Sequence, residues 1–329
     1  MAPIAAPVGP APDLASSVTA GILGRWHGSA EQRAATARAV AARDLTMANA
    51  PADLARRRGR LADRGLRLEG LVDRDDSVFS PFLVAGLTAA RSVGRVVHAR
   101  RGQPVRPVGT AALVTPSLVL TNNHVCPDTD TAAELAVEFG FAYDGEGGEP
   151  APDRRACRPD AFFLTDADLD WTLIAVADRG TRRAGARWGH LTLVEQTGKA
   201  VNGEHLNVVH HPGGDRQSFS IRDNRMVAED DLWLRYESDT RAGSSGAPVF
   251  NDQWEMVALH HGGVPRTDTD GHPLARTGQR WTPELGEDAL DYLGNEGARV
   301  SRILRSLRAL AGDLPADHRR LVRALLDPS

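Results

Sequence analysis

The stretch Gly243-Ser244-Ser245-Gly246-Ala247-Pro248, followed by the apolar pair Val249 and Phe250, carries the strongest chemical signal in this sequence. A nucleophilic serine must present its Oγ while nearby backbone N–H groups point at the oxyanion that develops during attack. Gly243 permits a close approach of the backbone, so the N–H groups of Gly243 and Ser245 can converge on one point. The stretch predicts a nucleophile at Ser245 and an oxyanion hole at Gly243 and Ser245, although a plain Gly/Ser turn before a strand fits the same letters.

A second signal lies upstream, where the apolar run Leu118-Val119-Leu120 passes into Thr121-Asn122-Asn123-His124. The run predicts a strand that ends in a polar turn and presents one histidine there. A single histidine is more often structural than catalytic, and this chain has 11 of them. The position at the end of a strand distinguishes His124 from the other ten and makes it a candidate general base.

The third signal is the segment Asp168-Leu169-Asp170-Trp171-Thr172-Leu173, in which Asp170 stands immediately before a β-prone strand. Burying a carboxylate is costly unless it is hydrogen-bonded, and the Nδ1–H group of a histidine is a suitable partner. Asp166 and Asp168 lie further upstream in the turn, where solvent or backbone N–H groups can satisfy them. We therefore assign the catalytic carboxylate to Asp170.

These three motifs, in the order His, Asp, Ser, resemble those of the trypsin-like serine peptidases and are most similar to the bacterial glutamyl-endopeptidase branch. The resemblance covers roughly residues 93–310. It implies a mainly β fold, a chymotrypsin-like double β-barrel of two six-stranded barrels with the triad His124, Asp170 and Ser245 at their junction. It also implies that Ser245 attacks the scissile carbonyl, that His124 takes the proton and that Asp170 fixes the imidazole tautomer. An acyl-enzyme would then form and be hydrolysed.

Short β-rich runs separated by Gly, Pro, Asp and Asn independently indicate a sandwich or barrels. The predicted strands are 93–97, 111–114, 118–120, 136–141, 173–177, 206–209, 231–236, 248–250 and 256–260. Around them we predict a disordered leader over residues 1–28, a helical N-terminal extension over 29–91, a protease domain over 92–311 and a short C-terminal helix over 312–329. Within the extension, Ser29 and Gln32 have capping-box spacing, and Pro51 and Pro81 open further helices.

The expected specificity pocket (S1) contains conflicting residues. Asp239 stands six residues before Ser245, where trypsin-type enzymes place the carboxylate that receives Arg or Lys. Thr240 and His260 match positions that glutamyl endopeptidases use to hold a substrate carboxylate. Because an ionised Asp239 repels a glutamate side chain, we favour basic residues at the substrate position before the cleaved bond (P1). A turn-capping role for Asp239 stays open.

Composition limits the remaining function classes. A formal net charge of −4 argues against a general nucleic-acid binder, and no run of 18 apolar residues indicates a membrane span. The N-terminus lacks a charged region ahead of an apolar stretch, and the two cysteines, Cys126 and Cys157, make a poor disulfide framework. We therefore expect a cytoplasmic protein in which Cys126 is a free thiol, with a bond to Cys157 as the alternative.

No cofactor or metal is expected, because the adjacent His210 and His211 would point to opposite faces of a strand and no third ligand follows at zinc-type spacing. The expected partner is a protein or peptide substrate, and the thin apolar faces of residues 29–91 need a protein surface to pack on. The favoured function is a regulated intracellular endopeptidase acting on a specific protein, with host defence as one version. The alternatives are a catalytically inactive trypsin-fold binding module and a broad-specificity glutamyl endopeptidase.

Overall fold

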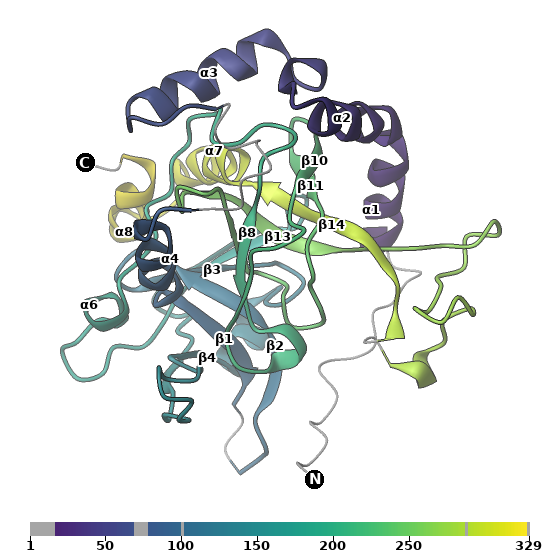
Figure 1. Ribbon diagram of the computed structural model, residues 1–329. Coiled ribbons are helices and arrows are strands. Elements are labelled where there is room, and N and C mark those ends of the chain that lie inside the picture. The colour runs from purple at the N-terminus through teal and green to yellow at the C-terminus, as the bar shows by residue number, and fades with distance from the viewer. Residues whose placement is uncertain (1–16, 69–77, 100–101, 287–288, 328–329) are drawn as a thin grey trace.

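The computed structural model describes residues 17–68, 78–99, 102–286 and 289–327, and its centre consists of two antiparallel seven-stranded sheets (Figure 1). The first has the strand order β5-β4-β1-β2-β3-β7-β6. Its strands are β1 (Val93–His98), β2 (Arg106–Leu113), β3 (Leu118–Thr121), β4 (Leu135–Phe139), β5 (Asp153–Ala156), β6 (Phe163–Asp166) and β7 (Trp171–Ala175). A bridge between Cys157 and Val176 shows that this sheet curls back towards itself.

The second sheet has the strand order β10-β11-β14-β13-β12-β8-β9. Its strands are β8 (Asn207–His210), β9 (Ser218–Ser220), β10 (Met226–Glu229), β11 (Trp233–Tyr236), β12 (Pro248–Phe250), β13 (Met256–Pro265) and β14 (Tyr292–Arg299). A bridge between His205 and Arg225 joins its two ends. The predicted mainly β double barrel with terminal helices is confirmed, with seven strands in each curled sheet where the resemblance implied six.

Helices surround the two sheets. The longer ones are α1 (Ser17–Gly28), α2 (Ala30–Ala42), α3 (Pro51–Ala62), α4 (Pro81–Ala90), α7 (Val300–Ala311) and α8 (Ala316–Leu326). The shorter ones are η1 (Leu45–Met47), α5 (Thr129–Ala133), α6 (Ala184–Trp188), η3 (Pro212–Gly214) and η4 (Pro283–Leu285). Figure 1 shows α1, α2 and α3 wrapped around the sheet that contains β13 and β14. No helix in these described ranges is long and apolar enough to span a bilayer.

The N-terminal segment differs from its prediction in two ways. Residues 17–28 form helix α1 where the sequence predicts a disordered leader, because Ile22 and Trp26 are buried against Val227 and Val264 of the second sheet. Residues 1–16 of the predicted leader lie outside the described residues. The predicted capping box is wrong: Ser29 Oγ donates to the carbonyl of Trp26, and Gln32 Oε1 accepts from the backbone N–H of Glu229 on β10.

Helix α3 is attached to the second sheet by a buried ion pair. Arg57 is 1% exposed, and its Nε lies 3.0 and 2.9 Å from the two carboxylate oxygens of Glu204. Its terminal nitrogen donates to Gln253 over 2.6 Å. Leu54 and Leu61 of the same helix pack on Val201. The thin apolar face of the extension therefore has its partner surface within this chain.

Replacing Arg57 with methionine is expected to lower the free energy of unfolding by about 3–5 kcal/mol, because Glu204 would stay buried without its cation. Denaturant unfolding measures the change. Arg58 is an exposed neighbour on the same helix, and Arg58→Met should change stability by no more than about 0.5 kcal/mol. If Arg57→Met cost no more than its neighbour, the ion pair would not be what attaches α3.

Helix α4 packs through its only glycine. A Cβ atom at Gly86 would lie 2.4 Å from the Trp254 ring, so the helix approaches the indole as closely as its backbone allows. Phe82 also contacts Trp254, with ring centroids 5.1 Å apart. Leu83, Val84 and Leu87 of the same helix are more than half exposed. A protein partner for residues 29–91 stays a prediction.

Candidate active site

The loop that carries Ser245 lies between β11 and β12 and is attached to both sheets. The backbone N–H of Thr110, on β2, donates to the carbonyl of Ser245 over 2.8 Å, and the Thr110 hydroxyl donates to the carbonyl of Gly243 over 2.7 Å. On the other side, the N–H of Gly246 donates to the carbonyl of His260 on β13 over 3.0 Å. Because each sheet holds one side of this loop, Ser245 lies where the two sheets meet.

Glycine is required at two positions of this loop. Gly243 has a φ of +88°, and a Cβ there would lie 2.6 Å from the carbonyl oxygen of His211. Gly246 has a φ of +83°, and its Cβ would meet the Thr110 carbonyl oxygen at 2.2 Å. Any side chain would clash with backbone at either position, in addition to the cost of a left-handed conformation. Steric clashes therefore explain why the sequence motif has glycine at positions 243 and 246.

The two peptide groups of the predicted oxyanion hole are held in fixed planes. The carbonyl of Ala242 accepts from the N–H of Gly213 over 2.6 Å, and the carbonyl of Ser244 accepts from the N–H of Ala247 over 3.0 Å. In a trans peptide the N–H points opposite to the preceding carbonyl, so these bonds also fix the directions of the Gly243 and Ser245 N–H groups. Donors held in this way need no reorganisation when negative charge develops.

His124 and Asp170 are brought together as the sequence predicts. His124 follows β3, Asp170 precedes β7, and these strands are paired antiparallel from Leu118 to Thr121. His124 Nδ1 lies 2.8 Å from Asp170 Oδ2, and the backbone N–H of His124 donates to Asp170 Oδ1 over 2.9 Å. Asp170 itself has a φ of +49°, a conformation that aspartate tolerates better than most residues, and its carbonyl accepts from the Asn122 amide.

The charges of this pair favour catalysis. Burial by itself would raise the pKa of Asp170, but its attraction and hydrogen bonds to His124 and His261 lower the pKa below the usual range. The carboxylate is therefore ionised at neutral pH. Partial desolvation of the His124 ring, whose side chain is still 38% exposed, would lower its pKa, but the Asp170 carboxylate raises it on balance. An ionised Asp170 accepts the Nδ1–H of His124, which leaves Nε2 as the basic nitrogen.

The upstream acids have the non-catalytic roles expected of them. Asp166 Oδ1 accepts from the backbone N–H groups of Asp168 and Leu169, so Asp166 caps the turn before β7. Asp168 is exposed. His261 was not predicted from the sequence, yet its Nδ1 lies 2.6 Å from Asp170 Oδ2. In the sequence, the sign of this contact is the pair His260-His261 after an apolar run.

Comparison with known proteins agrees with this geometry. Residues 109–259 match the family model of the trypsin-like peptidase domain. The chain contains a trypsin-like peptidase domain. It includes His124, Asp170 and Ser245 in the order that the resemblance implied.

Two curated relatives of this peptidase-containing chain align with most of its length. An uncharacterized protein of Sinorhizobium fredii, y4fB, is 36% identical over 260 residues, which are 73% of this chain and 39% of that protein. A probable serine protease of Lysobacter enzymogenes is 26% identical over 249 residues, which are 66% of this chain and 36% of that protein. This chain therefore spans less than two fifths of the length of either relative.

Solved structures with similar folds include two proteases. The active form of the Rv3671c protease from M. tuberculosis aligns with a TM-score of 0.44 and 16% identity, over 70% of this chain and 87% of that one. The serine endoprotease from Yersinia pestis aligns with a TM-score of 0.47 and 13% identity, over 72% of this chain and 69% of that one.

The predicted S1 residues of the peptidase domain have different surroundings. Asp239 is exposed, and its carbonyl accepts from the Ser220 hydroxyl over 2.8 Å. Thr240 is buried and donates its hydroxyl to Asn295 Oδ1. His260 is buried with Nδ1 2.7 Å from the Tyr236 hydroxyl, and burial lowers its pKa to about 3. Thr240 and His260 are thus hydrogen-bonded to other side chains of the protein, whereas the Asp239 side chain is accessible to solvent.

The serine before the nucleophile belongs to a buried polar chain. Ser244 Oγ lies 2.8 Å from His210 Nδ1, and His210 Nε2 lies 3.1 Å from the Ser220 hydroxyl. Burial lowers the pKa of His210 to about 3, so this imidazole is neutral. His211 Nδ1 bonds the carbonyl of Asp215. The adjacent histidines thus have separate partners, and Cys126 and Cys157 are both buried free thiols.

Proposed function

We propose that this chain is a serine endopeptidase that cleaves peptide bonds through an acyl-enzyme on Ser245. The observation that carries the proposal is the contact between the His124 ring and the ionised, buried Asp170 at the junction of the two sheets. It makes His124 Nε2 the base that removes the Ser245 proton and returns it to the leaving amine. The Gly243 and Ser245 N–H groups receive the oxyanion.

The rival from another class is an inactive binding module with the same fold. A fluorophosphonate probe separates the two, because it phosphonylates only an activated serine. The wild-type chain should be labelled at Ser245, located by peptide mass spectrometry, and should release the first product of an activated ester in a burst. A folded wild-type chain that takes no label would be a binding module.

For the substrate, the accessible Asp239 supports a basic P1 residue. A glutamate at P1 would need a positive partner, and a neutral, buried His260 bonded to Tyr236 provides none. An Arg or Lys side chain would instead find the Asp239 carboxylate. The glutamyl-specific alternative requires His260 to gain a proton in its buried site, which costs free energy.

We therefore expect peptides with Arg at P1 to have a kcat/KM at least about tenfold above those with Glu, from charge complementarity at the pocket. Asp239→Ser should remove that preference and leave turnover of a small ester substrate near the wild-type rate. Cleavage of a diverse peptide library gives both numbers, with the Ser245→Ala protein as the blank. Faster cleavage after Glu by the wild-type enzyme would instead assign recognition to Thr240 and His260.

A further inference from the structure

A second imidazole contacts the catalytic carboxylate. His261 Nδ1 lies 2.6 Å from Asp170 Oδ2, the same oxygen that His124 Nδ1 approaches to 2.8 Å. The His261 side chain is 4% exposed, and the Asp170 side chain is 6% exposed. The contact is therefore shielded from water. In such a buried site a hydrogen bond to a charged group is stronger than it is on the protein surface.

The positions of the protons follow from the charge on Asp170. An ionised carboxylate can only accept hydrogen bonds, so both Nδ1 atoms must carry a proton and donate it. Oδ2 thus accepts from two rings while Oδ1 accepts from the His124 backbone N–H. Three donors from two sheets leave the carboxylate one orientation, and that orientation sets the angle of the His124 ring.

His261 is held from behind by Trp233 on β11. The two ring centroids lie 4.7 Å apart, and Trp233 is 5% exposed. The guanidinium carbon of Arg25, on helix α1, lies 4.5 Å from the centroid of the same indole. Trp233 is therefore in contact with a residue at the catalytic carboxylate and with a residue of the N-terminal extension.

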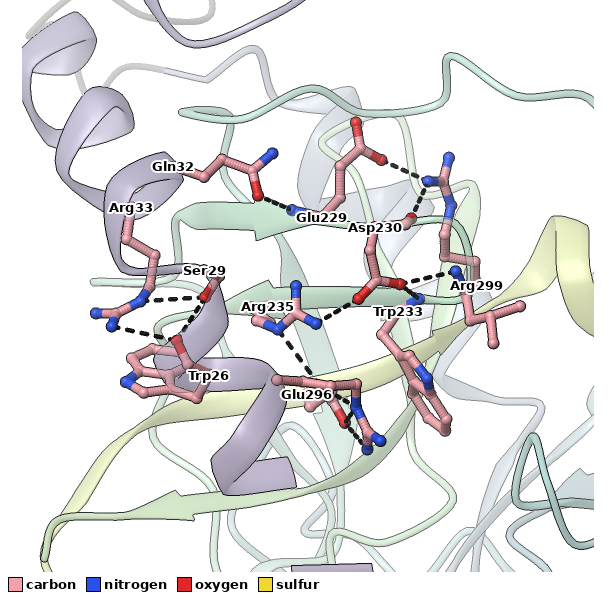
Figure 2. Close-up of polar contacts among 12 residues, drawn as sticks. Trp26, Ser29, Gln32, Arg33, Glu229, Asp230, Trp233, Arg235, Glu296 and Arg299 are labelled. Carbon is pink, nitrogen blue, oxygen red and sulfur yellow. Dashed lines mark hydrogen bonds and ion pairs between the residues drawn. The ribbon is translucent and has the colours of Figure 1, made fainter. Parts of the chain in front are cut away.

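Helix α1 also contacts the strand segment that carries His261. A Cβ atom at Gly262 would lie 3.0 Å from Ile22 Cδ1, so the helix lies directly on the backbone next to His261. Arg25 makes hydrogen bonds of 2.6–3.0 Å to the buried carboxylate of Glu296, which pairs with Gly262 across β13 and β14. Figure 2 shows Glu296 and Trp233 on neighbouring strands to one side of the helix that carries Trp26.

We propose that His261 is a positioning residue for the peptidase reaction, and that helix α1 holds it against Asp170 through Trp233 and Arg25. The proposal rests on the proposed function of the same site. In the acylation step the Ser245 proton passes to His124 Nε2, Asp170 stays ionised, and the His261 proton stays on Nδ1. His261 thus acts on kcat through the geometry of His124 and contacts neither the substrate nor the leaving group.

Two polar replacements test the donor position at residue 261. The amide nitrogen of asparagine is two bonds from Cβ, as Nδ1 of histidine is, whereas that of glutamine is one bond further. His261→Asn should keep kcat within about threefold of wild type, and His261→Gln should lower it about 10- to 100-fold, as expected for losing a hydrogen bond to a charged group. KM for a short peptide should stay within about twofold in both, since uniform substrate binding is untouched.

The contribution of α1 is tested from a distance. Arg25→Met should lower kcat about three- to tenfold through loosened packing at Trp233, and this loss should disappear when His261 is already glutamine, because coupled residues are not additive. Arg33→Met is the matched control: its guanidinium carbon lies 4.2 Å from the centroid of Trp26, in the same extension, and Figure 2 shows that pair apart from Trp233. It should leave kcat unchanged.

The outcomes separate this inference from the proposed function. If the wild-type chain takes no fluorophosphonate label, the peptidase function itself fails. If wild type is labelled and turns over, but the Asn and Gln variants have equal kcat, His261 does not position Asp170. Circular dichroism checks folding, and if His261→Gln does not fold, a loss of kcat in Arg25→Met equal to that in Arg33→Met overturns the proposal.

Discussion

Ser245→Ala is expected to lower kcat by on the order of 10⁶-fold, the loss seen when the nucleophile of other Ser-His-Asp enzymes is removed. Without Oγ no acyl-enzyme can form, and only the Gly243 and Ser245 N–H groups and substrate binding remain to assist direct attack by water. Initial rates on a peptide ester, normalised to the total protein concentration, measure the effect. Labelling by fluorophosphonate should disappear with the activity.

Combining this change with His124→Ala should cost little more than either change alone, because the serine and its base act as one unit. The prediction therefore distinguishes a triad from two independent contributions. A single variant that keeps wild-type turnover would remove its residue from the catalytic machinery.

Asp170→Asn is expected to lower kcat by roughly 10⁴-fold, the magnitude known for the equivalent change in a chymotrypsin-type triad. An asparagine amide can donate to His124 Nδ1 and so favours the tautomer in which Nε2 carries the proton and is not a base. In this chain the amide also faces His261 Nδ1, which donates to the carboxylate in the native protein. One donor would therefore lose its acceptor.

Asp168→Asn is the control for this change. Asp168 lies two residues before Asp170 and is exposed, and within the described part of the chain it contacts neither His124 nor His261. It should keep kcat within about twofold, the scale of an exposed substitution. Equal losses in the two variants would mean that the aspartates act on the fold of the turn and that Asp170 has no special role.

The sequence predicted the triad pair and the nucleophile loop because each lies next to a strong local pattern. An apolar strand before His124 and another after Asp170 are paired strands, β3 and β7, so the local patterns and the tertiary structure agree. The glycines around Ser245 are likewise explained by local clashes. Where the chemistry requires a particular backbone conformation, the residues that permit it are visible in the sequence.

Two of the missed strands, β5 and β14, have buried charged side chains where an apolar pattern is expected. Strand β5 carries Asp153 and Arg155, which are buried because they pair with one another over 2.9 Å. Strand β14 carries the buried Glu296, whose partner Arg25 lies 271 positions away. Ion pairs between distant segments satisfy these charges, and no local window contains that information.

The contact of His261 depends on a covered second face of strand β13 that the sequence does not reveal. Adjacent strand residues normally point to opposite faces, so the pair His260 and His261 predicts one histidine inside and one outside. Every residue of β13 from Met256 to His261 is buried, so both faces of the strand are covered and both imidazoles lie inside. The residues that cover the strand beside His261 include Ile22 of helix α1, which lies far away in the sequence and leaves no local pattern.

The hydrogen-bonded chain from Ser244 through His210 to Ser220 bears on how the loop that carries Ser245 is assembled. A protease matured by cutting its own chain can use the newly formed α-ammonium group to pair with a buried carboxylate beside the nucleophile, and this order–disorder step completes the oxyanion hole. Here the group beside the nucleophile is a hydroxyl, and its partner is an imidazole that is neutral at physiological pH. A neutral pair gives an incoming ammonium no charge to bind. The loop is already held by uncharged partners, so we expect chain cleavage before the first sheet to have no role in assembling it.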